Sequence, residues 1–98
     1  MLYITYWELN PDKDVRELTR VLAKLQQEGK WPLPGTEILA FYVTPSIPMW
    51  GITIGRSSNE EDFYRSLLML LNEVPGYFKS YRVSPVQEAR DMMKLALG

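Results

Sequence analysis

The side chains that carry out most enzyme chemistry are absent from this chain, which has no cysteine and no histidine. Thiol nucleophiles, disulfides and iron–sulfur clusters are therefore excluded, as are histidine general bases, Ser-His-Asp triads and haem held by a proximal histidine. Chemistry must come from arginine, carboxylate, hydroxyl and aromatic side chains. We accordingly expect no cofactor and no transition metal.

Few of the remaining groups are spaced for catalysis, and the sequence alone assigns no catalytic residue. Asn10 follows Trp7 closely, but an Asn-Pro pair before an apolar stripe is typical of a helix cap. Glu8 and Glu37 lie at the ends of predicted strands, where either could act as a general base. The acidic run at 59–62 could hold a cation, although carboxylates at a helix start more often complement the helix dipole.

The elements that position these residues follow from apolar periodicity and turn signals. Strands are predicted at 1–8, 37–44, 49–55 and 77–83. One helix is predicted from Asn10-Pro11 to Gly29, and a second from a capping box at Ser58 to Pro75-Gly76. A short final helix is predicted to open at Ser84-Pro85, with its apolar side chains inward: Val86, Ala89, Met92, Met93 and Ala96. The order predicts a ferredoxin-like βαββαβ fold over residues 1–98, with two helices on one face of an antiparallel sheet.

The second face of this sheet is the expected binding surface, because neither face of the strands shows the alternation of a solvated sheet. We assign Ile4, Ile52 and Ile54 to the helix side, where aliphatic density belongs. A semi-polar aromatic set then lies opposite the helices, and we predict that any small-molecule site is lined by Tyr3, Thr5, Trp7, Thr53 and Arg82. Trp7 serves either as interface core, which we favour, or as a substrate platform.

Arg82 is the residue in this set that would determine which class of ligand binds. Its guanidinium would hold a small organic acid through bidentate hydrogen bonds, or would pair with a carboxylate of the protein in a salt bridge, which is the favoured alternative. Such a polar face with aromatic side chains needs a cover. The candidates are the final helix, a second copy of the chain, or a ligand or partner protein.

Three segments give the chain an overall resemblance to a known superfamily: Leu2 to Trp7, Trp50 to Thr53, and Tyr81 to Pro85. In these the chain resembles small proteins of unknown function within the ferredoxin-like dimeric α+β barrel superfamily. The resemblance implies two sheets paired face to face, and in some members small molecules bound or transformed inside the barrel. It therefore supports a homodimer through the sheet face, which the strand pattern suggests independently.

The charge balance narrows the partners further. The net charge is −1, and the strand at 49–56 lacks the aromatic and basic pattern of an RNA recognition motif, so we expect no nucleic acid and no membrane surface as partner. No secretion signal is evident, and a cytoplasmic location is expected.

Two functions stay open. The first is a non-catalytic dimeric domain that binds a small molecule or serves in assembly, and the second is a cofactor-independent monooxygenase or isomerase.

Overall fold

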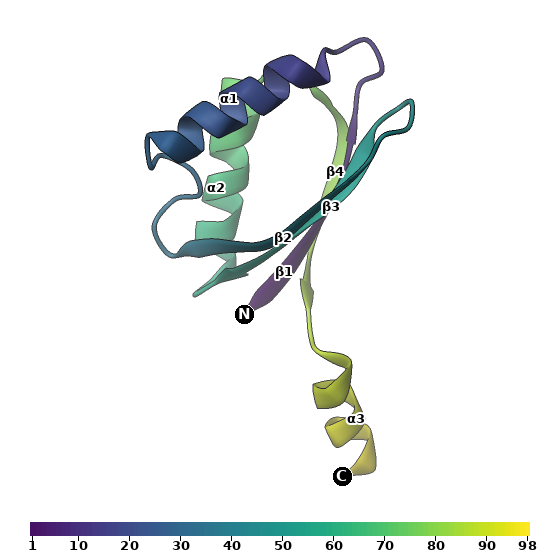
Figure 1. Ribbon diagram of the computed structural model, residues 1–98. Coiled ribbons are helices and arrows are strands. Elements are labelled where there is room, and N and C mark those ends of the chain that lie inside the picture. The colour runs from purple at the N-terminus through teal and green to yellow at the C-terminus, as the bar shows by residue number, and fades with distance from the viewer.

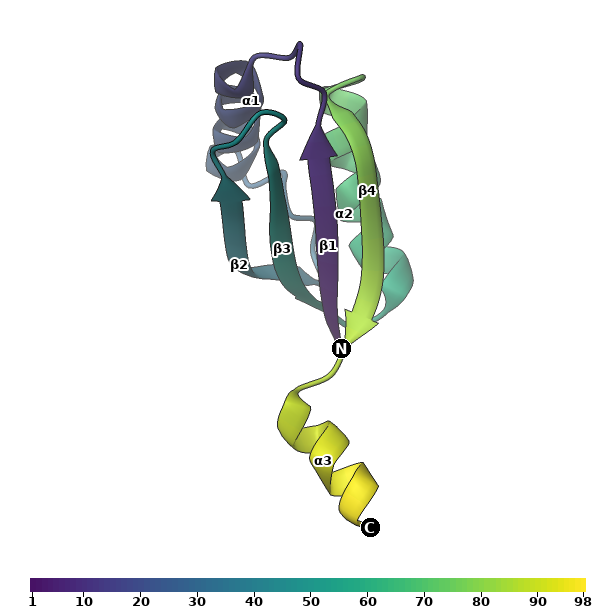
Figure 2. The same cartoon turned by 90° about the vertical axis from the view of Figure 1, so that its right-hand side faces the viewer.

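The computed structural model describes all residues from 1 to 98 as one four-stranded antiparallel sheet with three helices. The strands are β1 (Leu2–Leu9), β2 (Thr36–Thr44), β3 (Trp50–Ser57) and β4 (Phe78–Val86), and the helices are α1 (Val15–Gln27), α2 (Glu60–Glu73) and α3 (Ala89–Leu97). The sheet order is β2-β3-β1-β4. Helices α1 and α2 cover one face of the sheet (Figure 1), and Figure 2 looks onto the uncovered face. The predicted ferredoxin-like fold is confirmed.

The face of the sheet that meets the helices is the opposite of the one predicted. Tyr3, Thr5 and Trp7 of β1 are buried, and their partners across the ladder to β3 are Gly55, Thr53 and Gly51. Aliphatic side chains point away from the helices instead. The prediction failed because it placed the aliphatic side chains under the helices, whereas Gly51 and Gly55 make room on that side for buried aromatic rings.

The two rings occupy the space that a side chain on each glycine would need. A Cβ on Gly51 would lie 2.5 Å from Cζ2 of Trp7, and a Cβ on Gly55 would lie 2.6 Å from Cε2 of Phe63. Phe63 belongs to α2 and stacks on Tyr3, with 5.0 Å between the ring centroids. Two aromatic side chains thus fill the volume that larger residues on β3 would occupy, and this packing orients the whole sheet.

The opposite side, which we call the open face, consists of alternate residues of all four strands. Its members are Leu2, Ile4, Tyr6 and Glu8 of β1, Glu37, Ala40, Tyr42 and Thr44 of β2, Trp50, Ile52, Ile54 and Arg56 of β3, and Ser80, Arg82, Ser84 and Val86 of β4. Tyr6 and Trp50 pair at its centre with 5.6 Å between ring centroids. Tyr42 is 64% exposed, so this side presents large apolar groups to solvent.

The helix starts differ from the predicted caps by one to four residues. Asp14, rather than Asn10, is the N-cap of α1, and its side chain accepts a hydrogen bond from the Arg16 backbone N–H at 2.9 Å. The Asn10 side chain instead donates to the Gly76 carbonyl at 2.7 Å. Asn59, rather than Ser58, caps α2 by accepting from the Asp62 N–H. Several Asp, Asn and Ser side chains next to one another satisfy the same cap rule, so local pattern cannot choose among them.

The C-terminal region departs most from expectation. Ser84, Pro85 and Val86, predicted to open a helix, extend β4 along β1 as far as Leu2. Proline is tolerated there because β4 is an edge strand. Helix α3 begins only at Ala89, has no buried residue, and projects beyond the end of the sheet (Figures 1 and 2). Its Met92 and Met93 are exposed and do not fill a core.

Candidate functional site

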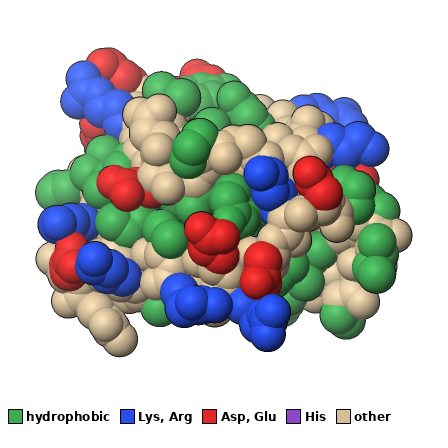
Figure 3. Space-filling view, turned by 90° about the horizontal axis from the view of Figure 1, so that it is seen from above, with side chains coloured by type: hydrophobic (Ala, Val, Ile, Leu, Met, Phe, Trp, Pro, Cys, Tyr) green, Lys and Arg blue, Asp and Glu red, His purple; other side chains and the backbone are tan.

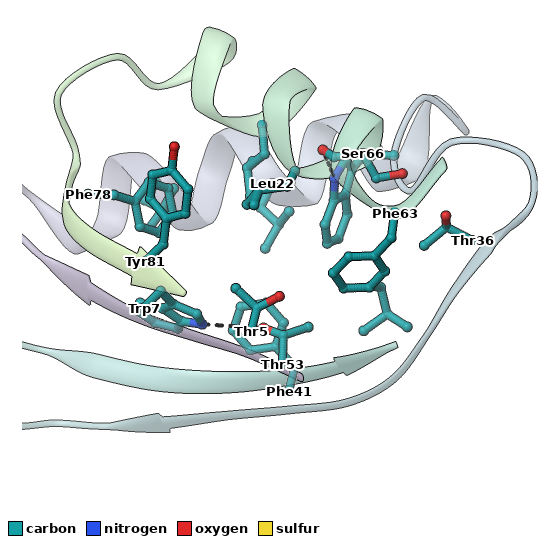
Figure 4. A pocket seen from close by; sticks show the side chains of 15 residues that line it. Thr5, Trp7, Leu22, Thr36, Phe41, Thr53, Phe63, Ser66, Phe78 and Tyr81 are labelled. Atoms are coloured by element: carbon teal, nitrogen blue, oxygen red, sulfur yellow. Dashed lines mark hydrogen bonds between the residues drawn. The ribbon is translucent and has the colours of Figure 1, made fainter. Parts of the chain in front are cut away.

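A pocket lies between the sheet and the two covering helices, with a volume of about 60 Å³. Its floor is made by the strands, its roof by α1 and α2, and side chains from both layers point into it (Figure 4). The fifteen lining residues are Thr5, Trp7, Leu18, Leu22, Trp31, Thr36, Ile38, Phe41, Thr53, Phe63, Ser66, Leu67, Leu70, Phe78 and Tyr81. Apolar and aromatic groups predominate, as is usual for small-molecule sites.

The local sequence explains why these residues converge. Period-2 alternation along β1 brings Thr5 and Trp7 to the same side, and their partners Thr53 and Gly51 follow in register. On α1 and α2 the helical period places Leu18 with Leu22 on one face, and Phe63 with Leu67 and Leu70 on the other helix. The pocket therefore arises where the apolar faces of two amphipathic helices meet the side chains of the sheet.

The polar groups of the lining are hydroxyls and indole N–H groups. Trp7 Nε1 donates to Thr53 Oγ1 at 3.3 Å, and Trp31 Nε1 donates to the Ser66 carbonyl at 2.9 Å. Ser66 Oγ in turn accepts from the Leu33 N–H at 3.0 Å. Thr5 is a buried residue whose hydroxyl forms no hydrogen bond within the chain, and since no fully buried side-chain oxygen lacks a partner, this oxygen is accessible to a small probe. It is thus an unused polar group that a bound molecule can engage.

No Lys, Arg, Asp or Glu lines the pocket, and Tyr81 is its single ionisable side chain. Phe41 of β2 and Tyr81 of β4 are the two exposed members of the lining, at 41% and 46%. Both lie on edge strands, so they mark where the pocket meets solvent (Figure 4). A water-poor, uncharged interior of this kind favours a neutral ligand, because a buried unpaired charge is costly.

Three of the five predicted ligand-binding residues, namely Thr5, Trp7 and Thr53, come together in this pocket, but on the helix side of the sheet. Tyr3 lies on the same side outside the lining and packs on Phe63. Arg82 is separated from them, because it stands opposite Tyr6 in the ladder and so belongs to the open face. It is exposed and forms no ion pair within one chain, so the salt bridge expected for it stays a prediction for an interface with a second chain.

Sequence reasoning missed the lining residues of the edge strands and of the loop after α1: Trp31, Phe41, Phe78 and Tyr81. Both faces of β2 are apolar, so alternation alone gave no sign that Phe41 points inward. The sequence did contain a signal for Trp31, because tryptophan side chains are highly buried on average, and this one lies in a proline-rich connection. Its indole N–H bonds to the backbone of α2 and ties that connection to the helix.

Glu37 and Glu61, two of the carboxylates weighed as catalytic or cation-binding groups, form ion pairs at the surface. Glu37 lies 3.8 Å from Arg56, and Glu61 lies 2.6 Å from Arg65. The one large pKa displacement belongs to Tyr77, outside the lining. A side-chain hydrogen bond with Glu17, aided by burial, raises the pKa of Tyr77 to about 12. Lys13 also lies over its ring, 5.5 Å from the centroid. Tyr77 and its neighbours therefore belong to the hydrophobic core and do not line the pocket.

On the upper side of the molecule, cationic and anionic side chains are interspersed around apolar patches (Figure 3). No single sign of charge dominates that side, so it has no field that would gather a polyanion. No helix has the length and apolar character needed to cross a membrane.

No family model matches the chain, and no curated protein matches it in sequence. Among solved structures, protein Atu4242 from Agrobacterium tumefaciens superimposes with a TM-score of 0.62 at 18% identity, covering 92% of this chain and 95% of that chain. The two share one fold. Given the observed strand order, that fold is ferredoxin-like α+β, and the resemblance suggested by the sequence is confirmed at this level.

Two further structures score lower. A candidate antibiotic biosynthesis monooxygenase from Chloroflexus aurantiacus J-10-fl has a TM-score of 0.46 at 17% identity, covering 90% of this chain and 96% of that chain. A candidate transposase from Deinococcus radiodurans R1 has a TM-score of 0.45 at 17% identity, covering 99% of this chain and 88% of that chain. A shared fold by itself assigns no function.

Proposed function

We propose that the protein binds a small, neutral, largely apolar molecule in the pocket between the sheet and the helices α1 and α2. The observation that carries this proposal is the hydroxyl of Thr5, which is free, whereas the other buried hydroxyls of the mainly apolar lining, those of Thr36, Thr53 and Ser66, are hydrogen-bonded within the chain. Aromatic walls supply contact area and a single polar group supplies orientation. The ligand class differs from the organic acid expected from the sequence, because Arg82 lies on the opposite face.

The size of the pocket sets a second condition on the ligand. A volume of about 60 Å³ holds a few waters at roughly 10–15 Å³ each, whereas an engineered apolar cavity that binds benzene measures roughly 150 Å³. A ring-sized ligand must therefore displace side chains. Phe41 and Tyr81 are the lining residues free to move, since both are partly in solvent. We expect ligands of one or two rings and slow entry past these two side chains.

A panel of neutral and charged probes tests this proposal. Indole and naphthalene should raise the melting temperature and change the tryptophan fluorescence, because Trp7 and Trp31 line the pocket. Benzoate, a carboxylate of similar size to indole, should do neither. If benzoate binds and the neutral probes do not, the proposed ligand class is wrong.

Two pairs of variants test whether the ligand binds in this pocket. Thr5→Val should weaken binding of indole while leaving the unliganded protein stable, because the lost hydroxyl has no partner in the chain. Thr19→Val, on the exposed side of α1, is the control. Leu22→Phe should fill the pocket and abolish binding of both neutral probes, whereas Ala23→Phe, exposed at the next position, should not. Binding that survives Leu22→Phe would place the ligand elsewhere.

The second part of the proposal is assembly: a second copy of the chain covers the open face to form a homodimer. Tyr6, Tyr42 and Trp50 expose aromatic surface there, and monomeric proteins rarely leave such a patch in water. Arg82 lies at the side of the patch, where it can pair with a carboxylate such as Glu8 of the partner copy. The dimeric α+β barrel architecture suggested by the sequence uses this same face.

Light scattering at micromolar concentration should give twice the chain mass of 11.4 kDa. Ile52→Lys places a charge in the centre of the patch and should yield a monomer that keeps its helical content. Lys79→Glu, on the exposed edge strand, is the control and should remain dimeric. A wild-type protein that is monomeric up to 100 times that concentration would overturn the homodimer.

A cofactor-independent monooxygenase or isomerase working in the same pocket is the alternative function. The observation in its favour is that the mainly apolar pocket holds an ionisable group, the hydroxyl of Tyr81, at its rim. The lining has no carboxylate, so proton transfer would depend on Tyr81 or on the ligand itself. Ligands found by the probe screen should be incubated with the protein under air. Oxygen consumption or isomer formation that Tyr81→Phe abolishes would establish the enzyme, and unchanged ligand would favour binding alone.

A further inference from the structure

Helix α3 is an amphipathic element without a partner in its own domain. Every residue from 87 to 98 is exposed, and the helix projects past the end of the sheet in both ribbon views (Figures 1 and 2). Leu95 and Leu97 are 73% and 88% exposed. Its charged residues, Arg90, Asp91 and Lys94, fall on one side when drawn at about 100° per residue. The remaining arc, about 200° wide, is entirely apolar.

Such a helix requires a packing surface to be stable. Helices shorter than about 12 residues are marginal in water on their own, and α3 has nine. Its N-cap, Glu88, makes no side-chain capping hydrogen bond, so local interactions stabilise it little. An apolar arc wider than half a turn also exceeds what one flat surface can cover, and fits a crevice between two surfaces.

The connection to β4 favours a surface outside the same domain. Only Gln87 and Glu88 separate strand from helix, and Glu88 has extended backbone angles, with φ of −65° and ψ of 140°. Tight reversals favour glycine or asparagine, and residues 77–97 contain neither. The chain therefore leaves the sheet along the line of β4 instead of folding back over it.

We propose that α3 is an exchanged arm, which packs its apolar side on a second copy of this chain at the rim of the open-face interface. This inference rests on the homodimer proposed above. At the end of the open face from which α3 departs, Leu2 pairs with Val86 and Ile4 lies next on that face, with Arg56 and Ser84 beside them. Because only Gln87 and Glu88 separate Val86 from α3, the apolar side of the helix begins close to this apolar group. Two-fold symmetry would give each subunit the arm of the other, in a crevice formed by both.

A matched pair of double variants in the full chain tests the arm. Met92→Gln with Met93→Gln keeps side-chain length and helix propensity but makes the apolar arc polar. Arg90→Gln with Lys94→Gln makes the same replacement on the charged side and serves as the control. We expect the first to raise the dimer dissociation constant at least tenfold and the second to change it less than threefold, as measured by analytical ultracentrifugation.

Hydrogen exchange of the α3 amides separates the possible outcomes. Protection that appears only at concentrations where the protein dimerises, and that the Met92/Met93 variant removes, supports the exchanged arm. A dimer with unprotected α3 and an unchanged dissociation constant in that variant would overturn the arm and leave the open-face homodimer standing. A monomer whose α3 is protected at every concentration would show that the helix folds back on its own domain, and would overturn both proposals.

Discussion

Gly51→Ala is the substitution that tests most directly which face of the sheet meets the helices. Gly51 lies on the helix side of β3, beneath the ring of Trp7 and beside the Tyr42 carbonyl of β2. An added Cβ would lie 2.5 Å and 2.9 Å from two carbons of the Trp7 ring, and closer still to the Tyr42 oxygen. One neighbour is backbone and the other is a ring that is only 6% exposed. Neither can move aside by a simple rotamer change.

The expected cost follows from this geometry. Overpacking a core by one methyl group typically costs about 1–3 kcal/mol, and a clash with paired backbone belongs at the upper end. We therefore expect Gly51→Ala to lower the free energy of unfolding by about 3 kcal/mol. For a domain of this size each kcal/mol lowers the melting temperature by about 4–8 °C, so the shift should be about 12–24 °C.

Urea denaturation followed by tryptophan fluorescence measures this change, and a second glycine provides the control. Gly29 has a φ of 67° and nothing within 4 Å of an added Cβ. Gly29→Ala should therefore lower the free energy of unfolding only by the cost of placing alanine in a left-handed backbone conformation, about 1–2 kcal/mol. If Gly51→Ala is no more destabilising than Gly29→Ala, Trp7 does not lie over Gly51 and the assignment of the faces is refuted.

A double-mutant cycle identifies the ring as the obstacle. In a Trp7→Leu background the smaller side chain leaves room above Gly51, so Gly51→Ala should cost less there than in the wild type. The clash with the Tyr42 carbonyl persists, so relief should be partial. A coupling energy of about 0.5–3 kcal/mol is expected for residues in contact. Additive effects would show that Trp7 and Gly51 do not touch.

Three other predictions concern stability. Thr53→Val removes the acceptor of the buried Trp7 N–H and should cost about 1–3 kcal/mol in urea denaturation, whereas Thr53→Ser, which keeps the acceptor, should cost less. Asn59→Ala should lower the free energy of unfolding by about 1 kcal/mol because Asn59 caps α2, and Ser58→Ala should lower it clearly less. If Ser58→Ala is the more destabilising of the two, Ser58 is the cap, as the sequence predicts. The raised pKa of Tyr77, about 12 against 10.0 for the free group, means that the folded state holds this proton more tightly than the unfolded state. Its contribution to stability should be complete below pH 10 and should decline as pH rises toward 12, and Tyr77→Phe should flatten that decline in unfolding experiments from pH 8 to 11.

The order of the elements was available from the sequence, because each depends on local rules. The apolar stripe Val15, Leu18, Leu22 and Leu25 requires a helix, and glycine with a positive φ ends that helix at Gly29. Such patterns act over a few residues and need no knowledge of the rest of the chain. Together with the right-handed crossover rule they lead to the ferredoxin-like fold.

The residues of the candidate site were only partly available. Period-2 alternation and the predicted strands grouped Thr5, Trp7 and Thr53 together, and the structure has all three in one pocket. Arg82 was grouped with them wrongly, since the register of β4 against β1 sets it opposite Tyr6. Register depends on the pairing of distant segments, and a slip of one residue moves every side chain to the other face.

The sequence by itself determined which side chains of β1 and β3 share a face, and tertiary structure decided the register of β4 and which face the helices cover. Both alternating sets of β1 are apolar or aromatic, so hydrophobicity does not distinguish them. What distinguishes them is shape: Trp7 and Phe63 fit only over Gly51 and Gly55, and that fit exists only once β1, β3 and α2 are packed together. The exposed α3 was likewise beyond local reasoning, because an amphipathic pattern states that a helix needs an apolar partner but not where that partner lies.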